Sequence, residues 1–92
     1  MAVSKIGASL YAKDYTLASV PIETRSGNGA YYGHYNIPEE SGCRAVSVLI
    51  LDWSGMAGVV VPYMDSNSDI GFISNSSQRI GALIIRILWQ KI

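Results

Sequence analysis

The chain has 92 residues, of which 49% are hydrophobic and 15% are charged, and its seven basic residues balance its seven acidic ones. A neutral chain has no long-range attraction for phosphate backbones or anionic lipid, so nucleic acids and membrane surfaces are not expected as partners. The longest apolar segment, Ile80–Trp89, contains Arg86 and is about half as long as a membrane-spanning helix of roughly 20 residues, so no membrane insertion is expected.

Ninety-two residues correspond to a single domain with a modest core, because a chain this short buries only about 60–65% of its extended surface. The average domain is roughly 25% charged, so this chain carries more apolar material than a small core can hold. We therefore expect the subunit to bury a second apolar face in a homo-oligomer. The alternative is a tightly packed monomer with a weakly charged surface.

The chain begins with Met1–Lys13, which has no sustained apolar core and does not resemble a signal peptide. Tyr15–Ile22 is predicted as a strand. Strict alternation would place Tyr15, Leu17 and Ser19 on one of its faces.

A turn is predicted at Arg25–Gly29, with Asn28 and Gly29 in the two positive-φ positions of a type I′ hairpin. Ala30–Ile37 is predicted as the next strand and contains three tyrosines. Pro38–Gly42 supplies the turn that follows it.

Four apolar runs separated by turn signals make up the second half of the chain. Ala45–Trp53 is apolar on both faces, so we expect both to be covered, by a second sheet or by a second subunit. Ala57–Met64 and Ile70–Ser74 are predicted as shorter strands. Arg79–Gln90 is long enough for a helix, but its β-branched residues and Gly81 favour a strand.

Short strands at this spacing are typical of antiparallel sandwiches. We therefore predict a single all-β domain, residues 1–92, that forms a small antiparallel β-sandwich of jelly-roll type.

Few side chains are suited to catalysis. His34 and Cys43 are the single histidine and cysteine, and they lie in separate segments. Carboxylates such as Glu23 and Asp52 could form a glycosidase pair, but their spacing selects no pair. No enzyme activity and no cofactor are expected, and Cys43 is expected to be a small buried or edge hydrophobe.

The loop Asp65–Asp69 has acidic or amide oxygens at alternate positions, as at the start of a calcium loop. The pattern then fails, because Ile70 and Ser76 stand where that loop needs a glycine and a bidentate glutamate. We predict no metal there but a hairpin loop whose side chains satisfy its own backbone, with a bound cation as the alternative.

The tyrosines indicate a sugar-binding surface. Aromatic rings stack on the apolar faces of sugars, and neighbouring carboxylates, amides and imidazoles fix the hydroxyl groups. Because loops at one end of a sandwich often carry recognition, the predicted ligand-binding residues are Tyr31, Tyr32, His34, Asp65, Asn67 and Asp69. The alternative is that the tyrosines are simply strand and core residues.

Three stretches together carry a resemblance: Lys13–Ile22, Ala57–Tyr63, and Ile80–Trp89 after Asn75–Gln78. They resemble the small C-terminal tip domains of tail-fibre, baseplate and head-fibre proteins from phages of Gram-positive gut bacteria. Such domains are typically β-sandwich trimers that attach to cell-surface carbohydrate. The tips usually follow a long shaft, whereas this sequence begins at Met1, so the resemblance implies either an excised domain or a free-standing accessory protein.

The resemblance implies a virion protein, made in the host cytoplasm without a signal peptide, whose partners are a cell-surface glycan and other virion proteins. The expected function is therefore receptor binding by a homo-oligomer, which the resemblance implies to be a trimer. A structural assembly or decoration protein without a ligand is the alternative. Trp89 is expected at the subunit interface, because large aromatic residues dominate interface energetics.

Overall fold

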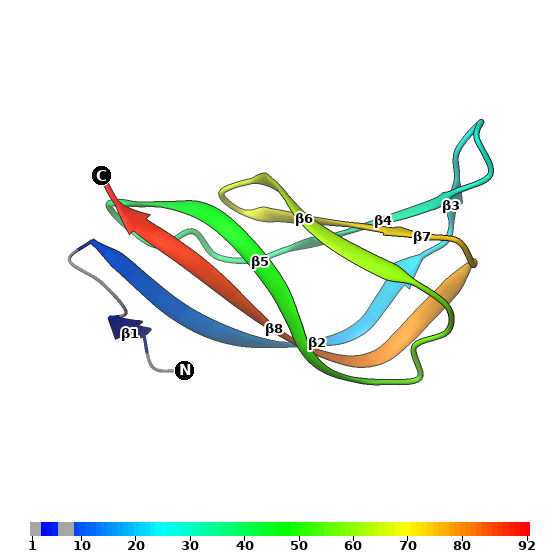
Figure 1. The fold of residues 1–92 in the computed structure, drawn as a ribbon, viewed down its shortest axis with the longest axis horizontal. Coiled ribbons are helices and arrows are strands. Elements are labelled where there is room, and N and C mark those ends of the chain that lie inside the picture. The colour runs from blue at the N-terminus through cyan, green and yellow to red at the C-terminus, as the bar shows by residue number, and fades with distance from the viewer. Residues whose placement is uncertain (1–2, 6–8) are drawn as a thin grey trace.

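The computed structural model describes residues 3–5 and 9–92, which form two antiparallel four-stranded sheets packed against each other (Figure 1). The strands are β1 (Val3–Lys5), β2 (Leu10–Ile22), β3 (Thr24–Arg25), β4 (Tyr31–Asn36), β5 (Cys43–Ser54), β6 (Val60–Ser66), β7 (Asp69–Ser74) and β8 (Gln78–Lys91). Sheet A has the order β1-β2-β8-β5, and sheet B has the order β3-β4-β7-β6. The predicted all-β sandwich is confirmed, and Arg79–Gln90 is a strand rather than a helix.

The strands do not pair in simple sequence order. β2 pairs with β8, and β4 pairs with β7 between them in the sequence, while β5 adds to the other side of β8 and β6 to the other side of β7. Because the chain passes repeatedly from one sheet to the other in this way, the sandwich is jelly-roll-like. No helix long and apolar enough to cross a membrane occurs in the part of the chain that the structure describes.

The core lies between the two sheets and depends mainly on β8. Every second side chain of that strand points inward and is fully buried, namely Leu83, Ile85, Ile87 and Trp89. Tyr15 and Leu17 of β2 flank them on sheet A, and Ile70 and Phe72 of β7 face them from sheet B. The residues that the structure buries are therefore the alternating apolar positions of the predicted strands.

The alternation changes phase in the middle of β2. Ser19 has a φ of 56°, and the pairing with β8 passes from Ala18–Ala82 to Val20–Ile80, so that Ser19 and the opposite Gly81 are skipped together without a change of register. Val20 and Ile22 therefore point into the core, whereas Ser19 is exposed. The prediction that Ser19 continues the face of Tyr15 is wrong, because one residue with positive φ reverses which side chains face inward.

β5 is the outer strand of sheet A and pairs with β8 alone among the described residues, so its second edge is unpaired there. That both faces of Ala45–Trp53 are covered, by a second sheet or by a second subunit, stays a prediction. Two further predictions differ from the structure. In the turn after β3, Gly29 has positive φ (87°) but Asn28 does not, so the turn is not type I′. The strand predicted at Ala57–Met64 begins only at Val60.

Candidate functional site

The outer face of sheet B carries the polar and aromatic side chains that the sequence pointed to. On its inner face Gly33 pairs with Phe72 and Tyr35 with Ile70, and both Phe72 and Ile70 are buried in the core. The residues that alternate with these along each strand therefore point away from the core. They form three rows of paired residues, each running from β4 through β7 to β6: Tyr32, Ile73 and Val61; His34, Gly71 and Tyr63; and Asn36, Asp69 and Ser66.

His34 lies between two carboxylates that come from the hairpin joining β6 and β7. Its Nδ1 atom is 3.0 Å from Oδ2 of Asp69 and 4.0 Å from Oδ2 of Asp65. Asp65 reaches this position at the register shift between Met64 and Ser66, which interrupts the pairing of β6 with β7. The histidine and the hairpin, far apart in the sequence, thus form one hydrogen-bonding group on the surface.

Tyr63 adds an aromatic ring that lies across Gly71. A Cβ at Gly71 would be 2.1 Å from Cζ of this ring, so the tyrosine occupies the space that a side chain there would need. Partial burial raises the pKa of the Tyr63 hydroxyl, and the neighbouring Asp65, Tyr32 and Asp69 raise the pKa further. The hydroxyl therefore stays protonated at neutral pH and can donate a hydrogen bond.

We call Tyr32, His34, Tyr63, Asp65 and Asp69 the sheet B patch. Four of these residues were predicted from the sequence, and the structure brings them together. Tyr63 was missed because its own segment reads as an apolar strand, and only the pairing of β6 with β7 reveals that it stands next to His34.

The structure separates two other predicted residues from the patch. Tyr31 lies on the inner face of sheet B and packs against the core. The Oδ1 atom of Asn67 accepts a hydrogen bond from the backbone N–H of Ala45 in β5, at 3.1 Å. Tyr31 is thus a partly buried residue at the margin of the core, and Asn67 ties the β6–β7 hairpin to the edge of the other sheet.

The patch also contains a set of potential metal ligands. His34, Asp65 and Asp69 each offer one ligand atom, and these atoms all lie within 4.8 Å of one another. Such a nitrogen and carboxylate set suits first-row divalent ions. Asn67, the middle residue of the loop that was compared with the start of a calcium loop, lies outside this ligand set and uses its Oδ1 atom to accept a hydrogen bond from Ala45.

Trp89, predicted at a subunit interface, is fully buried in the core of this chain. It therefore has no surface to offer a second subunit, because the indole lies on the inward-facing side of β8. The exposed large apolar side chains of sheet A lie instead on β5: Val46, Leu49, Leu51 and Trp53, each between 39% and 54% exposed.

Comparison of the chain with protein-family models, with curated proteins and with solved structures finds no match.

Proposed function

We propose that this chain is a non-enzymatic module that attaches to cell-surface carbohydrate as a homo-oligomer, with the sheet B patch as its sugar contact. The observation that supports the proposal is the convergence of two tyrosines, an imidazole and two carboxylates on one open sheet face, from three strands. Placement of the protein on a virion surface rests on the resemblance to phage fibre tips alone.

The patch combines the two kinds of contact that sugars require. The ring of Tyr63 lies over backbone at Gly71, which holds it as a platform on which an apolar sugar face can stack. Asp65 and Asp69 have carboxylate oxygens that accept hydrogen bonds from neighbouring hydroxyl groups. His34 lies between them and orients Asp69 through its 3.0 Å contact.

A shallow, exposed patch of this kind gives weak binding at each site, with Kd values on the order of millimolar. Several copies on one particle raise the overall affinity without any new contact. The exposed apolar side chains of β5 support such self-association, because contiguous apolar surface is usually covered by other protein.

A glycan array tests this function with wild type and three variants. Tyr63→Ala and Asp69→Ala are expected to lose the sugars that the wild type retains. Thr16→Ala, which alters an exposed strand residue on the other sheet, is expected to keep them. Retention of no sugar by the wild type, or equal retention by all four proteins, would refute sugar recognition by the patch.

A structural role without a ligand is the second candidate. It is favoured by the same apolar side chains of β5, which suit docking to other proteins as well as to copies of the chain. In that case the protein binds no sugar on the glycan array, whereas its mass in solution still exceeds that of a monomer.

A further inference from the structure

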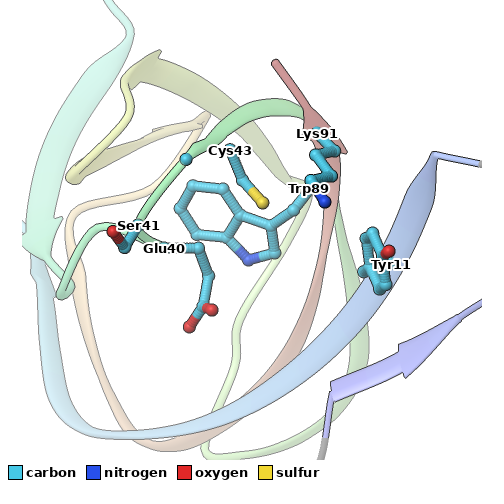
Figure 2. Close-up of a pocket in the computed structure, with 7 residues that line it drawn as sticks. Tyr11, Glu40, Ser41, Cys43, Trp89 and Lys91 are labelled. Atoms are coloured by element: carbon cyan, nitrogen blue, oxygen red, sulfur yellow. The ribbon is translucent and has the colours of Figure 1, made fainter.

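A recess at one end of the sandwich contains a buried polar group that has no hydrogen-bond partner among the residues that the structure describes. The recess has a volume of about 270 Å³ and is lined by Tyr11, Glu40, Ser41, Gly42, Cys43, Trp89 and Lys91 (Figure 2). Ser41, Gly42 and Lys91 are exposed and form its rim, whereas Trp89 is fully buried and forms its floor. None of these residues belongs to the sheet B patch.

The floor carries an unpaired hydrogen-bond donor. The Nε1 atom of Trp89 is buried, and no hydrogen-bond acceptor reaches it within residues 3–5 and 9–92. The hydroxyl of Tyr15 is in the same situation. Burial raises the pKa of Tyr15, and a hydrogen-bonding interaction with the Trp89 side chain opposes the rise, so the Tyr15 hydroxyl lies beside the indole N–H without reaching full hydrogen-bond geometry. An unpaired buried donor costs about 1–3 kcal/mol, which an incoming acceptor would recover.

The wall beside the indole carries the complementary group. Figure 2 shows the nitrogen edge of Trp89 turned toward the space between Glu40 and Tyr11, with the sulfur of Cys43 close to the ring. Oε1 of Glu40 accepts a hydrogen bond from Lys13 at 2.5 Å, which leaves Oε2 for another donor. The recess therefore offers one donor, one acceptor and an apolar wall formed by Tyr11 and Cys43.

We propose that this recess binds a small neutral secondary amide, in particular an N-acetyl group. The amide carbonyl accepts from Nε1 of Trp89, the amide N–H donates to Glu40, and the acetyl methyl lies against Tyr11 and Cys43. The Lys13–Glu40 ion pair gives this wall no net charge, so neither an anionic nor a cationic ligand is favoured over a neutral one. A hydroxyl group could make both hydrogen bonds but would leave the apolar wall without a partner.

Binding requires a small movement, because Nε1 of Trp89 is shielded from solvent. Glu40 is the flexible part of the wall: it is partly exposed and held by a single side-chain contact to Lys13. Rotation of its side chain uncovers the indole nitrogen and keeps the carboxylate within reach of the ligand.

Titration followed by NMR tests the proposal directly. The chain has two tryptophans, so a nitrogen-labelled sample gives two indole N–H signals, and the exposed Trp53 serves as an internal control. N-acetylglucosamine is expected to shift the Trp89 signal saturably, with a Kd on the order of millimolar, while glucose leaves it unmoved. N-acetylglycinamide forms a second arm: a shift with both amides assigns recognition to the acetyl group alone, and a shift with the sugar alone assigns it to an N-acetylated sugar.

Two variants separate the proposed contact from the ion pair. Glu40→Ala removes the acceptor and is expected to weaken binding about two- to tenfold. Lys13→Gln breaks the same ion pair but keeps the carboxylate and frees it to rotate, so its binding should be at least as tight as that of wild type. Tyr32→Ala should also bind normally, which makes this test independent of the sheet B patch. The proposal is overturned if neither amide moves the Trp89 signal, if glucose moves it equally, or if Glu40→Ala binds like the wild type.

Discussion

The backbone carbonyl of Pro21 in β2 lies where a side chain of Gly33 in β4 would begin: a Cβ at Gly33 would be 1.8 Å from that oxygen. Here the end of β2 crosses directly over sheet B, which requires a residue without a side chain. The neighbours of Gly33 in β4 are Tyr32 and His34, so this close crossing also fixes two residues of the sheet B patch.

Gly33→Ala is therefore expected to destabilise the fold by about 3 kcal/mol or more, because backbone rather than a flexible side chain must move. Gly27→Ala is the matched control, since a Cβ there meets nothing within 4 Å. Thermal unfolding followed by circular dichroism measures both, with about 4–8 °C per kcal/mol for a domain of this size. Equal melting temperatures for the two variants would show that β2 and β4 do not cross in this way.

Ser19 tests the phase change in β2. A non-glycine residue with positive φ costs about 1–2 kcal/mol, so Ser19→Gly should stabilise the protein by up to about 1 kcal/mol. Ser19→Val should destabilise it by a similar amount, because β-branched residues tolerate positive φ least. Chemical denaturation gives both values. A valine variant as stable as the wild type would mean that Ser19 does not adopt this conformation.

The ion pair Asp14–Arg86 is expected to contribute to the loss of stability in acid. Two hydrogen bonds join the side chains, Nε to Oδ1 at 2.7 Å and Nη2 to Oδ2 at 3.0 Å. They hold the pKa of Asp14 below its usual value of 3.8. A carboxyl whose pKa is lowered by folding stabilises the fold above its unfolded pKa, and this contribution is lost as the pH falls through the folded value.

Melting temperature should therefore decline below about pH 4 in the wild type, and Asp14→Asn should reduce the decline while lowering stability at neutral pH. Glu23→Gln serves as a control, because Arg79 reaches Glu23 with a single hydrogen bond between two half-exposed side chains. If the melting temperatures of Asp14→Asn and wild type fall in parallel as the pH is lowered, the pair does not contribute to the pH dependence of stability.

Self-association should depend on β5 and not on Trp89. Trp53→Ala is expected to lower the mass measured by light scattering at micromolar concentration while it leaves the melting temperature nearly unchanged, since the side chain is 54% exposed. Trp89→Ala is expected to destabilise the fold by about 3–5 kcal/mol, because it empties a fully buried site. A wild type that is monomeric under these conditions would contradict the homo-oligomer.

The strands could be predicted from the sequence because each apolar run is bounded by turn residues and because burial selects alternate side chains. The phase change could not be predicted, because it depends on one backbone angle at Ser19. The exposed position of β5 was also missed. Its two faces are equally apolar in the sequence, and only the strand order shows that it lies at the edge of its sheet.

Only part of the candidate site could be predicted, because the members of the site depend on which face of a strand each residue occupies and on how distant strands pair. Tyr31 and Tyr32 are neighbours in the sequence, but adjacent residues of a strand point to opposite faces, so one packs at the margin of the core and the other is in the patch. Tyr63 belongs to the patch only through its pairing across Gly71 with His34. Register between distant strands therefore decides the site, and residue types alone do not reveal it.

The most direct measurement of sugar recognition is the affinity of wild type and Gly71→Ala for a sugar that the wild type retains on the array. A methyl group at Gly71 would take the place of the Tyr63 ring, which lies at the surface and can swing aside, so the fold should survive with the platform displaced. The account predicts at least a tenfold loss of affinity with a nearly unchanged melting temperature. Stacking of a sugar on an aromatic ring is worth about 1 kcal/mol or more, and the displaced tyrosine also loses the hydrogen bonds that its hydroxyl makes to the sugar. Unchanged affinity in a folded Gly71→Ala protein would contradict sugar binding by the sheet B patch.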